Sequence, residues 1–134
     1  MDIVTHKQLN MLINLALADK QFVPKEKKLI FKIAKEKGYA RRKVTELMEH
    51  TEPIGTFGAL TPEQKFEYLY NAICLVKIDN KVPESEMMFC QDIAIRLGYH
   101  KHVVNILLDY IDVNCSEAEN KEELKKMVEK YLPI

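Results

Sequence analysis

Apolar residues recur three or four positions apart along most of this chain, which is the spacing of one face of an α-helix. Leu9, Leu12, Ile13, Ala16 and Leu17, for example, form one such stripe. Together with start and stop signals, this spacing predicts helices over residues 5–18, 24–37, 40–50, 62–78, 83–97, 100–113 and 116–131. We therefore expect an all-α fold of about seven helices.

The residues that flank these segments are typical helix starts and stops. Pro24 suits the first position of a helix, because a proline has no N–H that the helix start would leave unpaired. Thr61 and Gln64 form a capping-box pattern, in which each side chain accepts a hydrogen bond from the backbone N–H of the other residue. Gly38 and Gly98 are expected to end helices, because glycine adopts a positive φ without strain.

The chain also contains an internal repeat with an offset of 60 residues. This offset matches Leu9 with Leu69, Ile13 with Ile73, Asp19 with Asp79, Glu26 with Glu86, Ala34 with Ala94, and Gly38 with Gly98. So many matches at one offset indicate a duplicated unit. We expect a single domain over 1–134, in which two three-helix units, 5–50 and 62–113, are related by a pseudo-twofold axis. Residues 51–60 are the connector, and 116–131 form an added C-terminal helix.

Each copy of the repeat places Asp at the end of one helix and Glu seven positions later in the next helix. In one interpretation Asp19 and Asp79 cap the free N–H groups of the following helix, while Glu26 and Glu86 bond back to the turn. In the other, these carboxylates converge on a hard divalent cation such as Ca²⁺ or Mg²⁺, which prefers oxygen ligands. An EF-hand is excluded, because its third loop position would be Lys81.

This arrangement resembles the TerB-like tellurite-resistance family: an apolar helix ending in Asp, a short turn, Glu in the next helix, then Ala and a Gly stop, all repeated. The resemblance covers about residues 5–112. Lys20 and Asn80 stand where the family usually has Gly, and Val23 and Pro83 stand where it has a hydroxyl cap. The resemblance implies an all-helical module without catalytic activity, found in bacterial stress-response systems and beside co-chaperone domains. It also implies a metal-binding surface at the four acidic positions named above.

The charges are balanced overall but divided unevenly along the chain. Residues 1–60 carry 11 Lys and Arg against 7 Asp and Glu, whereas residues 61–134 carry 9 against 13. Arg41, Arg42 and Lys43, together with the Lys-rich face of the helix over 24–37, form a basic patch that is either a solvated face or a contact for phosphate or an acidic partner. We expect no nucleic-acid binding, because a nucleic-acid binder usually has a larger basic excess.

The cysteines, the histidines and the N-terminus add three expectations. Cys74, Cys90 and Cys115 show no CxxC spacing, so we expect reduced thiols in a cytoplasmic protein. His100 and His102 are two positions apart in a predicted helix, which places them on different faces and disfavours a shared metal site. No leader-like segment opens the sequence and no apolar run approaches the roughly 20 residues that span a bilayer, so we expect no membrane insertion.

No motif of a known catalytic class is present, and neither His6 nor His50 has a partner nearby in the sequence. We therefore expect a non-enzymatic stress-response or interaction module that binds a protein partner, with Arg41, Arg42 and Lys43 as the candidate surface. The alternative is a divalent-metal-binding or metal-sensing domain that uses the repeated Asp/Glu pairs, with Ca²⁺ or Mg²⁺ as its cofactor. The sequence leaves the oligomeric state open.

Overall fold

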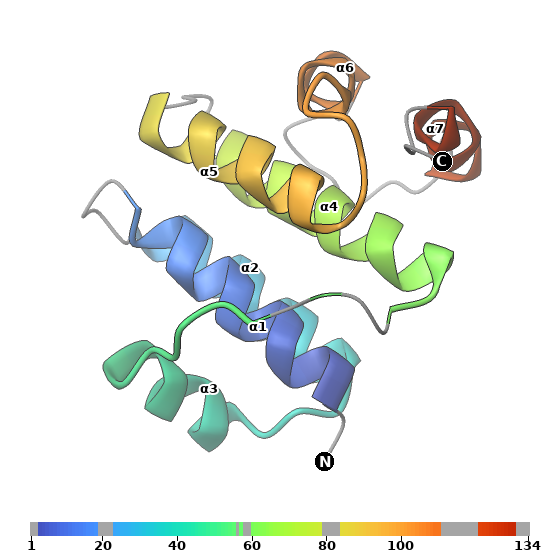
Figure 1. The fold of residues 1–134 in the computed structure, drawn as a ribbon. Helices are drawn as coiled ribbons and strands as arrows, with labels where there is room; N and C mark the ends of the chain where they lie inside the picture. Colours follow the sequence, from blue (N-terminus) through green and yellow to red (C-terminus); the bar gives the residue numbers. More distant parts are fainter. Residues whose placement is uncertain are drawn as a thin grey trace.

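The computed structural model describes residues 3–18, 23–55, 57, 60–78, 84–110 and 121–130. These residues contain no strand and form seven helices: α1 (Ile3–Ala16), α2 (Pro24–Glu36), α3 (Arg41–Glu49), α4 (Pro62–Lys77), α5 (Glu84–Arg96), α6 (Val103–Tyr110) and α7 (Lys121–Glu129) (Figure 1). The predicted all-α fold is therefore confirmed. None of the described helices has the length and apolar character needed to cross a membrane.

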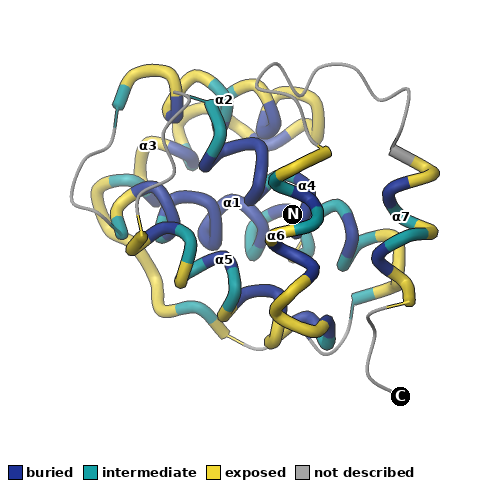
Figure 2. The backbone as a smooth tube through the Cα atoms, turned by 90° about the horizontal axis from the view of Figure 1, so that it is seen from above, coloured by how far each residue is buried: buried dark blue, intermediate teal, exposed yellow. Residues whose placement is uncertain are grey.

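Helices α1 and α4 pack against each other, and each has more buried residues than any other described helix. Nine residues of each helix are buried, and Figure 2 shows the buried colour along most of α1. Helices α2 and α3 contact α1, α6 contacts α4, and α5 contacts both α1 and α4. Helix α7 contacts α6. The prediction that the helix over 62–78 is largely buried is confirmed, and the apolar residues around most of its circumference explain why.

Polar side chains also join α1 to α4 inside this contact. The side-chain amide of Gln8 donates to Glu67 Oε2 over 2.9 Å and accepts from Asn71 Nδ2 over 2.6 Å. The hydroxyl of Tyr68 donates to the backbone carbonyl of Val4. Because each buried polar group must find a partner of suitable geometry, these bonds fix how α1 lies along α4.

The predicted helix stops are confirmed at both glycines. Gly38 has a φ of +73° and Gly98 a φ of +95°. The residue after each glycine donates its backbone N–H over 2.8 Å to the carbonyl five positions earlier, Tyr39 to Ala34 and Tyr99 to Ala94. These bonds close the C-termini of α2 and α5 and turn the chain toward the next helix.

The predicted start of α4 is confirmed, but other boundaries differ from the prediction. Gln64 donates its N–H to Thr61 Oγ1 over 3.1 Å, and Thr61 donates its N–H to Gln64 Oε1 over 2.9 Å. Helix α6 begins at Val103 rather than at 100, because the N–H of Val103 bonds to the carbonyl of His100 in a tight turn. Helix α1 ends at Ala16, so Leu17 lies beyond it and is 37% exposed. The predicted start of the last helix at 116 lies outside the described residues.

The described helices agree locally with the repeat. Helices α2 and α5 have bounds that differ by 60 residues at both ends, and each is followed by a glycine of positive φ. Glu26 and Glu86 are buried at equivalent positions, with 4% and 3% of their surface exposed. The pseudo-twofold relation between the two whole units stays a prediction.

The cysteines differ from the expectation of three reduced thiols. Cys90 is a buried free thiol, whose pKa is raised by burial and by the nearby carboxylate of Glu86. Cys74 is instead disulfide-bonded, so the expectation is wrong for this residue. The spacing of cysteines along a chain shows which helix face each occupies but not what the folded chain brings beside it. Cys115 lies outside the described residues.

Candidate functional site

The acidic pairs of the repeat are only partly described. Asp19 and Asp79 lie outside the described residues, whereas Glu26 and Glu86 are buried near the starts of α2 and α5. Glu26 Oε1 accepts the backbone N–H of Val23 over 3.1 Å. The prediction that Glu26 bonds back to the turn is therefore confirmed, and this bond satisfies a donor that the helix start would otherwise leave free.

The metal interpretation gains no support from the described part of the chain. Among the described residues, no group of three or more His, Cys, Asp or Glu side chains is arranged to hold a metal ion. Glu26 already uses one carboxylate oxygen as a cap. Whether the pairs also bind Ca²⁺ or Mg²⁺ depends on the two aspartates, so this interpretation stays a prediction.

A groove of about 480 Å³ runs between α2 and the start of α3, and its lining is basic and apolar. We call it the basic groove, and Pro24, Lys27, Lys28, Phe31 and Arg41 line it. The first four lie on one face of α2, because positions three and four apart share a helix face. Phe31 is half-buried, and the guanidinium carbon of Arg41 lies 4.0 Å from the centroid of its ring.

The stacking of Arg41 on Phe31 prepares the groove to bind anions. A guanidinium that lies over an aromatic face keeps its N–H edge free for a carboxylate or phosphate, and its side chain loses less freedom on binding. Neither Lys28 nor Arg41 forms an ion pair with another described residue. The groove therefore presents uncompensated positive charge beside an apolar ring.

The three residues of the predicted basic surface at 41–43 do not line one common pocket. Arg41 lines the basic groove, Lys43 lines a different pocket, and Arg42 is exposed and lines neither. Successive positions on a helix differ by about 100°, so three neighbours in sequence point in three directions. The residues that accompany Arg41 in the basic groove come from α2, whose Lys-rich face belonged to the predicted patch.

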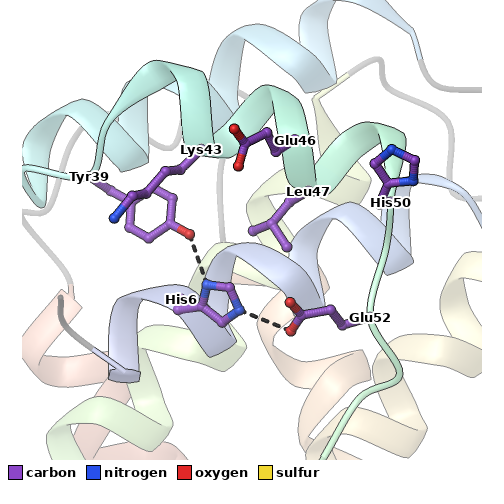
Figure 3. A pocket seen from close by; sticks show the side chains of 7 residues that line it. All are labelled: His6, Tyr39, Lys43, Glu46, Leu47, His50 and Glu52. Atoms are coloured by element: carbon purple, nitrogen blue, oxygen red, sulfur yellow. Dashed lines mark hydrogen bonds and ion pairs between the residues drawn. The ribbon is translucent and has the colours of Figure 1, made fainter.

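The second pocket has a volume of about 370 Å³ and lies between α1, α3 and the connector (Figure 3). We call it the His6 pocket, and it is lined by His6, Tyr39, Lys43, Glu46, Leu47, His50 and Glu52. Sequence reasoning missed it, because His6 bonds to residues 33 and 46 positions away. No local sequence signal marks such distant partners.

A chain of hydrogen bonds fixes the imidazole in this pocket. His6 Nε2 lies 2.9 Å from Glu52 Oε1, and His6 Nδ1 lies 2.8 Å from the hydroxyl of Tyr39. Because a carboxylate accepts hydrogen bonds, Nε2 carries a proton, and in the neutral ring Nδ1 accepts from Tyr39. The order carboxylate, imidazole, hydroxyl also occurs in hydrolases, where the hydroxyl is a nucleophile. Here burial, then Glu52 and then Glu46, raise the pKa of Tyr39, which opposes ionisation of that hydroxyl.

The backbone of Glu52 is held as firmly as its side chain. Asn10 accepts the N–H of Glu52 over 3.1 Å and donates its amide to the carbonyl of the same residue over 3.0 Å. Asn14 donates to that carbonyl over 3.1 Å. This clamp ties the connector to α1 and orients the Glu52 carboxylate toward His6.

The two histidines before α6 differ from the expectation. His100 and His102 are both exposed, but their rings stack with centroids 4.6 Å apart and planes 23° apart. The expectation that they point to different faces is wrong, because residues 100–102 form a turn rather than a helical segment. The N–H of His102 donates to His100 Nδ1 over 3.3 Å, which explains the parallel arrangement.

Comparisons with family models, curated proteins and solved structures found no match to this chain. The resemblance to the TerB-like family therefore stays a prediction based on the repeated acidic pattern.

Proposed function

We propose that this chain is a non-enzymatic interaction module that binds an acidic segment of a protein partner in the basic groove. The observation that carries the proposal is the stacking of Arg41 on Phe31 at 4.0 Å in a groove that two exposed lysines also line. A role in bacterial stress response belongs to the same proposal and rests on the TerB-like resemblance. The cytoplasmic location expected from reduced thiols loses that support, because Cys74 is disulfide-bonded.

The chemistry of the groove favours a peptide over other ligands. Carboxylates of the partner match Lys27, Lys28 and Arg41, and an aliphatic side chain between them contacts Phe31 and Pro24. Interfaces with few direct contacts obtain their affinity from such a central aromatic and arginine anchor. A nucleic acid fits less well, because the chain has as many acidic as basic residues and one groove provides few cations.

The experiment compares two neighbouring arginines. The probe is a synthetic peptide rich in Glu that contains one Leu, titrated calorimetrically into the wild-type chain, into Arg41→Gln and into Arg42→Gln. Arg41→Gln is expected to weaken binding about tenfold, which is the usual effect of losing one charge-assisted hydrogen bond. Arg42→Gln removes the same charge outside the groove and is expected to change affinity little. Equal losses in the two variants would show that binding depends on net charge, and would overturn the proposal.

A further inference from the structure

The His6 pocket contains charged side chains that form no ion pair with another described residue. Lys43 and Glu46 lie three positions apart on α3, yet neither forms an ion pair or side-chain hydrogen bond with another described residue. Lys43 is half-buried, and its ammonium group has no carboxylate partner among the described residues. His6, Tyr39 and one oxygen of Glu52, by contrast, are already bonded to one another.

The pocket is lined by side chains of both charges. Glu46 and Glu52 both raise the pKa of Tyr39, which places negative potential around its hydroxyl. Lys43 supplies the opposite charge at the same pocket, and Leu47, of which 5% is exposed, supplies an apolar wall. Figure 3 shows Leu47 pointing from α3 toward His6. A ligand that satisfies these groups needs an ammonium group, a carboxylate and an aliphatic part.

We propose that the His6 pocket binds a free aliphatic α-amino acid. Its ammonium group pairs with the Glu46 and Glu52 side of the pocket, its carboxylate pairs with Lys43, and its side chain lies on Leu47. The volume of about 370 Å³ is at the small end of the range for ligand pockets, which suits a ligand of this size. Asn10 fixes the backbone of Glu52 and His6 holds its carboxylate before the ligand arrives, which lowers the entropic cost of binding. The pocket shares no residue with the basic groove, so the two proposals stand independently.

The test uses three probes of similar shape and different charge. L-leucine carries both charges, 3-methylbutylamine carries only the ammonium, and 4-methylpentanoate carries only the carboxylate. Each is titrated to millimolar concentration while the backbone amide resonances of the ¹⁵N-labelled chain are recorded. Leucine is expected to shift the resonances of His6, Lys43 and Leu47, and each single-charge probe is expected to bind at least about tenfold more weakly. Shifts caused equally by leucine and by the amine would overturn the proposal, as would no response to leucine.

Matched variants on α3 separate a binding role from a structural one. Lys43→Met and Glu46→Gln are expected to weaken leucine binding about tenfold each, because each removes one charge that the ligand pairs with. Arg42→Met and Glu49→Gln make the same chemical changes at exposed positions of α3 outside the pocket and serve as controls. The melting temperature of every variant reports whether the fold is intact. Undiminished leucine binding by a folded Lys43→Met variant would contradict the proposal.

Discussion

At the scale of single residues, the buried carboxylate of Glu26 makes a contact that depends only on the local sequence. Glu26 is 4% exposed, and a carboxylate loses much of its hydration when it is buried. Its bond to the N–H of Val23 offsets part of that cost. The sequence was sufficient to predict this contact, because a Glu at the third helical position meets the helix start through the local geometry of the backbone.

The hydrogen bonds of His6, in contrast, depend on residues that are distant in the sequence. Its partners, Tyr39 and Glu52, belong to the α2–α3 turn and to the connector. The periodicity of the sequence indicates which face of α1 is buried, but it carries no signal for which polar group of another element meets that face. The hydrogen bonds of His6, and therefore the pocket around it, could be found only from the structure.

Tyr99 gives a prediction about alkaline pH. Burial, and then the carboxylate of Glu129, raise its pKa from 10.0 to about 12. In the unfolded chain the hydroxyl ionises at the lower pH, so the unfolded state is favoured as the pH rises above 10. The stability contributed by neutral Tyr99 is therefore complete below pH 10 and is lost as the pH rises through about 12.

The measurement is the free energy of unfolding of the wild-type chain and of Tyr99→Phe as a function of pH. A phenylalanine cannot ionise, so the variant is expected to avoid a loss of about 2 kcal/mol that the wild-type chain shows across this interval. Between neutral pH and pH 9 the two curves are expected to run parallel. If they also run parallel up to pH 12, burial of Tyr99 does not raise its pKa.

At the scale of elements, helix ends were predicted better by glycine than by apolar spacing. Gly38 and Gly98 both adopt the positive φ that the sequence indicated. Spacing alone placed the start of α6 at 100, because His100 and His102 are compatible with a helix but do not require one. The turn before Val103 depends on where the chain must cross to pack α6 against α4 and α5, which is a tertiary property.

Gly98 and Gly55, two of the three described glycines with open surroundings, provide a matched test. A Cβ atom added at Gly98 or at Gly55 would meet nothing within 4 Å, but only Gly98 of these two has a positive φ. Gly98→Ala is expected to lower the free energy of unfolding by about 1 kcal/mol, because the alanine is strained there. Gly55→Ala is expected to be neutral or slightly stabilising. Equal effects in urea denaturation would mean that φ at Gly98 does not control the end of α5.

At the scale of the whole molecule, the uneven division of charge along the chain matches the two halves of the repeat. The first half carries the excess of basic residues, and its helices α2 and α3 form the basic groove. The all-α fold and the central position of α4 could be predicted, because both depend on patterns within one helix. The groove could not, because it requires Phe31 and Arg41, ten positions apart, to meet across the α2–α3 turn.

We propose the basic groove as the surface with which this chain binds its partner. The most direct test maps where the Glu-rich peptide binds, by recording the backbone amide resonances of the ¹⁵N-labelled chain during a titration. We expect the largest shifts at the residues that line the groove, Lys27, Lys28, Phe31 and Arg41. These shifts are expected to diminish as salt is added, because the contacts are ionic. Shifts spread evenly over the basic side chains, or concentrated on α4 to α7, would contradict the proposal.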